Sequence, residues 1–369
     1  MIQNNAVLFR INKATPAAWV NPTTKQIGLG ENQIRLPELT SAQERIIEAL
    51  YSGIVSGQEA IVDQISQAEP GETKRLIELL KPTLENHHKV GFGGWNNLSF
   101  SEIARASLDY QVNGEMVLAE RWQRTVHIDQ LDKTGLLLTK ALLASGVGKI
   151  ISHDTGLVIN TDTSEVGYPE NHRNQKRIIA TREILQEQSS RLVDGELRNA
   201  SGIKVSFAVT IGHLALNPKT YSRWLNRDVN HLAIEYGLAD FKVSPVIIPG
   251  KTACLNCYQE SLVDQDEAWP VIASQLLDSP RVRDDSAALL TATGLAVRSI
   301  LRNLDEQAGF QYVGKPDAEY LLGYQANYST GSVTRLKFDK HRLCSCQNTI
   351  SEAQGSGWAG SNDLNLGLP

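Results

Sequence analysis

The apolar and polar positions of the first 70 residues predict a small module of their own. Residues 26–36 contain a turn rich in Gly and Asn between two short stretches with strand-like residues, which predicts two short strands. Thr40 with Gln43 forms a capping-box pattern, and apolar residues then recur at helical spacing from 46 to 51. A second helix follows a glycine turn. We interpret residues 1–70 as a winged-helix-like module, the alternative being that these elements pack directly on the main domain.

The next segment, residues 71–122, mixes polar and apolar positions without a clear period. It contains the glycine-rich, loop-like stretch 91–95. We therefore expect a linker or connecting segment here, and assign it no chemistry.

From residue 123 the pattern changes to alternating strands and helices. A strand at 126–128, a helix at 136–143, a glycine turn and a strand at 149–153 lead to Asp154. This is the first unit of a doubly wound, mostly parallel sheet. A helix is expected from 174 to 188, and further strands at 203–209, 232–236 and 246–248. The predicted fold class is α/β, with this domain covering 123–350 and a tail at 351–369.

Composition narrows the classes of partner. The chain has 369 residues with a net charge of −5, so it lacks the basic excess typical of nucleic-acid binders. No apolar run approaches the roughly 20 residues needed to span a bilayer, and the N-terminus lacks the pattern of a secretion signal. We expect a cytoplasmic protein that binds neither nucleic acid nor membrane.

The chain has four cysteines, in two close pairs. Cys254 and Cys257 form a CxxC pair, and Cys344 and Cys346 form a CxC pair. Two such pairs supply the four thiolates of a tetrahedral structural Zn²⁺ site. The functional rival is a thioredoxin-like redox pair, since CxxC is common to both. The second pair favours zinc, and a reducing cytoplasm disfavours disulfides.

Three segments resemble the ThiF/MoeB/HesA family, relatives of the ubiquitin-activating enzymes. They are Leu142–Ile150 followed by Asp154, the run Pro249–Cys257, and the late cysteine pair, which in the family is usually CxxC. The resemblance covers about residues 120–350. It implies a homodimer that binds ATP and adenylates the C-terminal carboxylate of a peptide or protein, with Asp154 as the ribose-binding acid.

Two further features resemble a bacterial subgroup of this family. The run Asp264–Pro270 and His341, ahead of the CxC pair, are similar to proteins associated with leader-peptide binding in modified-peptide biosynthesis. Members of that subgroup carry a winged-helix-like peptide-recognition module before the ThiF-like domain. The interpretation of residues 1–70 fits this arrangement.

The phosphate-binding loop departs from the family pattern. Gln130 and Asp132 occupy the positions of its first two glycines, and only Gly135 remains. A side chain there blocks close approach of phosphate, and the Asp132 charge repels a triphosphate. Lys133 and Lys176 remain candidate phosphate contacts, although Lys176 could equally be a solvated lysine on a helix face.

The family's other phosphate and metal ligands are also replaced. Asp162 occupies the position of an asparagine, Glu165 lies near that of an arginine, and Asn217 lies where a Mg²⁺-binding aspartate is expected. Asparagine is a poorer ligand for a hard cation than a carboxylate. The sequence therefore disfavours binding of ATP with Mg²⁺ without excluding it.

Two functions remain in competition. The first is a ThiF-like scaffold with a degenerate nucleotide site, which binds a precursor peptide or small protein and presents it to a partner modifying enzyme. The peptide would add as a strand to residues 27–36. The alternative is an active ATP-dependent adenylyltransferase in which Lys133 compensates for the lost glycines. A NAD-dependent reductase fits worse, since the same glycines are absent.

Overall fold

The computed structural model describes residues 8–30, 33–87, 99–197, 202–277, 279, 284–313 and 321–347. The chain divides into two compact units, one of residues 1–207 with 289–320, the other of residues 208–288 with 321–369. Among the described residues, no helix combines the length and apolarity needed to cross a bilayer.

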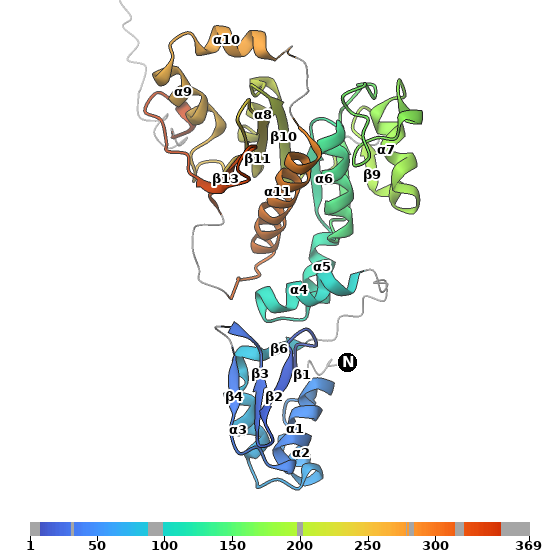
Figure 1. The fold of residues 1–369 in the computed structure, drawn as a ribbon, viewed down its shortest axis with the longest axis vertical. Coiled ribbons are helices and arrows are strands. Elements are labelled where there is room, and N and C mark those ends of the chain that lie inside the picture. Colours follow the sequence, from blue (N-terminus) through green and yellow to red (C-terminus); the bar gives the residue numbers. More distant parts are fainter. Residues whose placement is uncertain are drawn as a thin grey trace, which may run out of the picture. The chain divides into compact units, whose positions relative to one another are not determined.

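The N-terminal part of the first unit contains two small antiparallel sheets and three helices (Figure 1). One sheet has the strand order β5-β1-β6 and the other the order β2-β3-β4. The strands are β1 (Leu8–Ile11), β2 (Ala17–Asn21), β3 (Thr24–Ile27), β4 (Ile34–Leu36), β5 (Ile54–Val55) and β6 (Leu84–His87). The helices are α1 (Ser41–Ser52), α2 (Glu59–Ser66), α3 (Glu72–Leu79) and the 3₁₀ turn η2 (Lys81–Thr83).

The start of α1 follows the sequence prediction. The Thr40 hydroxyl accepts a hydrogen bond from the Gln43 N–H, and the Gln43 side chain accepts one from the Thr40 N–H. This confirms the capping box, which satisfies two backbone donors that an uncapped helix leaves unpaired. The helix buries Ile46, Ile47 and Leu50 in the core of the module.

The segment expected to be a linker is instead largely regular structure. It contains α3, η2 and β6, then α4 (Phe100–Tyr110) and α5 (Gly114–Trp122). Strand β6 pairs with β1, with Glu85 opposite Arg10, and Leu84 joins the module core. The module therefore extends to residue 87, beyond the expected boundary at 70. The glycine-rich stretch 91–95 lies outside the described residues.

The α/β part of the first unit begins with a strand, a helix and a strand, as predicted. Strands β7 (Thr125–Ile128), β8 (Lys149–Ser152) and β9 (Leu192–Asp194) run parallel, and α6 (Lys133–Ala144) connects the first two. The glycine turn after α6 is sterically required, because a Cβ on Gly148 would lie 1.7 Å from the Trp122 carbonyl oxygen.

The helix expected at 174–188 is shorter than predicted. Asn174 has a φ of 66° and Gln186 a φ of 50°, so the right-handed helix lies between them. It is α7 (Arg177–Leu185), preceded by the 3₁₀ turn η4 (Glu170–His172) and followed by η5 (Gln186–Arg191).

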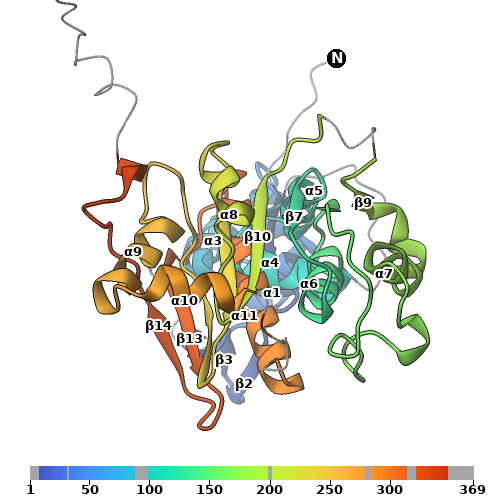
Figure 2. The same ribbon diagram turned by 90° about the horizontal axis from the view of Figure 1, so that it is seen from above.

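The second unit combines parallel and antiparallel strands. Strands β10 (Phe207–His213) and β11 (His231–Tyr236) are parallel, whereas β12 (Asp240–Val243), β13 (Gly323–Asn327) and β14 (Val333–Leu336) follow in antiparallel order. Its helices are α8 (Pro218–Leu225), α9 (Leu255–Gln265) and α10 (Trp269–Leu276), with the 3₁₀ turn η8 (Ser345–Gln347). The long α11 (Ser286–Gln307) spans the boundary between the units. Figure 2 shows α9 beside α10, which contacts it.

The α/β fold class is confirmed, with corrections in the second half of the chain. The strand expected at 203–209 lies at 207–213, where all seven residues are buried. Residues 246–248 form no strand, although Ile247 bridges His231. The antiparallel strands β12, β13 and β14 were not predicted. They make one side of the otherwise parallel sheet antiparallel.

Candidate functional site

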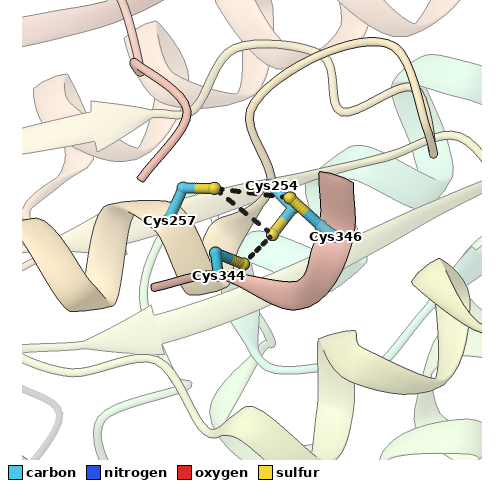
Figure 3. Close-up of side chains that lie close together, drawn as sticks. All are labelled: Cys254, Cys257, Cys344 and Cys346. Atoms are coloured by element: carbon cyan, nitrogen blue, oxygen red, sulfur yellow. Dashed lines mark hydrogen bonds between the residues drawn. The ribbon is translucent and has the colours of Figure 1, made fainter. Parts of the chain in front are cut away.

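The four cysteines lie at one place in the second unit (Figure 3). Cys254 is the N-cap residue of α9, and Cys257 lies in the first turn of the same helix. Cys344 immediately precedes η8, and Cys346 lies within it. Two segments about ninety residues apart thus bring their paired thiols together, as the sequence predicts for a shared metal ion.

The spacing of the sulfurs fits a tetrahedral metal. The four Sγ atoms all lie within 4.8 Å of one another. The Cys254 sulfur is 3.8 Å from that of Cys257 and 3.5 Å from that of Cys344, and the Cys257 sulfur is 3.5 Å from that of Cys346. Four Zn–S bonds of about 2.3 Å place neighbouring sulfurs about 3.8 Å apart. A disulfide would need about 2.05 Å.

The surroundings of the thiols suit a closed structural site. Cys254, Cys257 and Cys344 are buried in an apolar cluster, and Cys346 is half-buried. Burial raises the pKa of the Cys254 thiol, and burial with hydrogen bonds to neighbouring thiols raises the pKa of Cys346 to about 11. A bound dication would offset the cost of ionising these crowded thiols. All four positions of a tetrahedral ion would be filled by sulfur, which leaves none for a reacting water.

A polar anchor holds α9 against the sheet beside this cluster. The Tyr258 ring stacks on Phe338 at a centroid distance of 4.6 Å, and its hydroxyl donates to the Glu235 carboxylate at 3.2 Å. Glu235 lies on β11, where burial raises its pKa. The helix that carries the first cysteine pair is therefore fixed to a central strand.

The expected phosphate loop is closed by its own side chains. The Asp132 carboxylate accepts a hydrogen bond from the Gly135 N–H at 3.0 Å and caps α6. A Cβ on Gly135 would lie 1.9 Å from the Gln130 carbonyl oxygen. This glycine is thus required for close packing of the loop on the helix. Lys133, the first residue of α6, is half-buried.

Both backbone polar groups of Leu131, in the middle of this loop, are hydrogen-bonded. The Leu131 N–H donates to the Asp154 carboxylate at 2.6 Å, and the Leu131 carbonyl oxygen accepts from the Tyr168 hydroxyl at 2.6 Å. The second Asp154 oxygen accepts from the Gly156 N–H at 2.7 Å. Both oxygens of the expected ribose-binding acid are therefore engaged by backbone, and Leu131 is fully buried.

An arginine that the sequence reasoning missed faces this region. The Arg177 guanidinium donates to the Asp162 carboxylate at 2.7 and 3.0 Å and to Asp154 at 3.4 Å. Burial opposes its charge, but the three acids around it, Asp132 among them, raise its pKa. Burial raises the pKa of Asp162 despite Arg177.

Lys176, for which the sequence left open a phosphate contact or a solvated lysine, is exposed at the N-cap of α7. Its neighbour in the sequence, Arg177, is the residue that turns inward. Asn217, at the expected position of the metal acid, caps α8 by accepting from the Lys219 N–H at 3.0 Å. Asn217 thus serves as a helix cap, and both Asp154 oxygens accept backbone hydrogen bonds.

No protein-family model matches the chain, and no curated protein matches it in sequence. Solved structures do match its fold. E. coli MccB with ATP gives a TM-score of 0.65 at 14% identity, over 92% of this chain and 100% of that one. The microcin C7 biosynthetic enzyme MccB in complex with N-formylated MccA gives 0.65 at 13%, with the same coverage. PaaA gives 0.60 at 12%, over 88% of this chain and 98% of its own.

At such low identity these likenesses show the fold. They show that almost the whole chain has a fold like those of MccB and PaaA, and they do not single out a subgroup. Fold alone does not assign activity, which has to be argued from the site.

Proposed function

We propose that this chain is a ThiF-like scaffold whose nucleotide site is degenerate. It binds a precursor peptide or small protein and presents it to a partner modifying enzyme. The observation that carries this proposal is the position of Asp132. Its carboxylate already caps the helix N-terminus at which a phosphate would bind.

The charges around this helix support the same conclusion. The N-terminus of a helix carries about half a positive charge, which attracts phosphate, and a side-chain anion at the same place weakens that attraction. Asp132 neutralises that charge, and Arg177 is engaged by Asp162 and Asp154. An entering triphosphate would have to break these contacts and lie beside three carboxylates.

The cysteine site has a structural role in this proposal. A zinc ion held by the four thiolates would join α9 to the segment that ends in η8. Its four sulfur ligands would stabilise the second unit without supplying chemistry.

We assign peptide binding to the winged-helix-like module. Within the candidate range 27–36, β3 is paired on both sides, so β4 is the edge strand among the described residues. Leu36 of β4 is buried in the module core, and Ile34 packs against it. A strand added here would extend a sheet that is already backed by the core. All five residues of β2, at the other edge, are exposed.

MccB, a structural neighbour, has been solved with MccA, which is consistent with a peptide partner for this chain. We extend the proposal to a cytoplasmic protein, and to a homodimer, which the family resemblance implies. Sedimentation of the purified full chain at several concentrations tests that assembly directly.

The alternative is an active adenylyltransferase, favoured by the ATP-bound structure of the neighbour MccB. Calorimetric titration with ATP and Mg²⁺, followed by pyrophosphate exchange, separates the two functions. We expect neither heat of binding nor exchange, whether or not a synthetic candidate precursor peptide is present. Mg²⁺-dependent ATP binding would show that the nucleotide site is functional.

A further inference from the structure

His341 and Asp264 form a contact between the two segments that carry the cysteines. The His341 ring Nε2 is 3.0 Å from the Asp264 carboxylate, which lies on α9. The imidazole is buried to a side-chain exposure of 10%, whereas Asp264 is 60% exposed. The contact thus links the helix of the CxxC pair to the loop of the CxC pair.

The backbone of the same histidine touches both cysteine pairs. Its carbonyl oxygen accepts a hydrogen bond from the Cys344 N–H at 3.0 Å, and its N–H donates to the Cys257 sulfur. The Leu343 N–H donates to the ring Nδ1 at 3.3 Å. Because Nδ1 accepts, the ring proton is on Nε2 and is donated to Asp264.

The CxC pair needs such outside support more than the CxxC pair does. The first turn of α9 fixes Cys254 and Cys257 relative to each other. Cys344 and Cys346 are separated by one residue, and the regular structure described at this pair is the three-residue turn η8. The two pairs must therefore be aligned by contacts made elsewhere.

We propose that His341 and Asp264 act as a clamp that aligns the two cysteine pairs, with His341 as a positioning residue for the metal. The inference rests on the proposed zinc site. Side chains that orient metal ligands typically change metal affinity by about 10- to 100-fold when removed. The clamp also compensates for the short spacing of the CxC pair, which is tighter than the usual CxxC.

The test compares zinc release from the full chain to a chromogenic chelator. The variants are D264A, H341N and H341Q, with D339A as the matched control. Asp339 pairs with Lys337 in the same segment, and both side chains are exposed. We expect D264A and H341N to release zinc about tenfold faster. D339A should match the wild type, and H341Q, whose amide nitrogen can replace Nε2, should lie close to it.

Two further measurements separate positioning from a general loss of structure. The double variant D264A/H341N should release zinc no faster than either single variant, because both remove one contact. Cobalt(II) bound to each variant should keep the absorption of a tetrahedral thiolate site, since all four ligands remain.

The outcomes that overturn the clamp differ from those that overturn the metal site. Release from D264A at the rate of D339A would refute the clamp, and so would additive effects in the double variant. A wild-type chain that binds neither zinc nor cobalt would refute both. Asp264 is exposed, so D264A tests the clamp even if the histidine variants fail to fold.

Discussion

The Asp132 carboxylate lies 3.0 Å from the Gly135 N–H, so α6 begins with an anion of its own. In a phosphate-binding loop this position is open and the ligand supplies the negative charge. Here the side chain satisfies the donor, and Asp132 is 1% exposed. The Asp132 side chain thus caps the start of the helix, at the position where we propose that it excludes phosphate.

The first prediction concerns this cap. Asp132→Ala should lower the free energy of unfolding by about 1 kcal/mol, because it leaves the Gly135 N–H without its acceptor. Asp132→Ser keeps an oxygen acceptor and should lose less. Urea denaturation of the full chain measures both. Equal losses in the two variants would show that the hydrogen bond is not the stabilising element.

The second prediction concerns the buried pair of Arg177 and Asp162. Arg177→Met leaves the Asp162 charge buried and unpaired, which costs about 3–5 kcal/mol in comparable cases. Arg173→Met is the matched control, since Arg173 pairs with Glu170 at the surface and such pairs contribute little. Adding Asp162→Asn to Arg177→Met should restore part of the loss. No loss from Arg177→Met would contradict the pairing.

The stability lost in Arg177→Met should depend on pH in a defined direction. Burial already raises the pKa of Asp162 in the folded chain, and removal of Arg177 raises it further. A carboxyl group whose pKa is higher in the folded chain than in the unfolded chain stabilises the fold at pH values below its unfolded-state pKa. That stability is lost as the pH rises through its folded-state pKa. The deficit of Arg177→Met should therefore be largest near pH 7 and shrink toward about pH 4. A deficit independent of pH would exclude Asp162 as its cause.

The features that the sequence predicted well are local ones. Thr40 and Gln43 are three residues apart, so both partners of the capping box lie within one helical turn and can be recognised from local sequence. The first α/β unit follows in the same way from period and glycine turns. The cysteine site joins residues distant in the sequence. It could still be predicted, because the chain has four cysteines and a four-thiolate metal site needs all of them.

The features that were missed depend on contacts distant in sequence or on the direction of one side chain. Strand β6 pairs with β1, with Arg10 opposite Glu85, and no local period reveals such a pairing. Lys176 and Arg177 are adjacent and both basic, so composition cannot tell which one enters the core. The left-handed backbone at Asn174 places the helix start at Arg177, with Lys176 as the N-cap residue, and Arg177 is the one whose side chain is buried.

The third prediction concerns the metal. We expect about one zinc per chain by elemental analysis, and a lower melting temperature in a chelator that is restored by added zinc. Cys257→Ser should lose most of the metal, and Ser345→Ala, between the two late cysteines, should keep it. A metal-free chain with an unchanged melting temperature in chelator would remove the structural role of this site.

The last prediction concerns the edge strand β4, where we propose that a peptide binds. A peptide that pairs with β4 would protect its outward-facing backbone N–H groups from exchange with solvent. Hydrogen exchange of the full chain, measured with a synthetic candidate precursor peptide, should slow at residues 33–37. The exposed strand β2 (17–21), at the other edge of the same sheet, is the internal control and should be unchanged. Protection of β2 with none at β4 would move the binding site to the other edge. Binding without protection in either strand would exclude strand addition to this sheet.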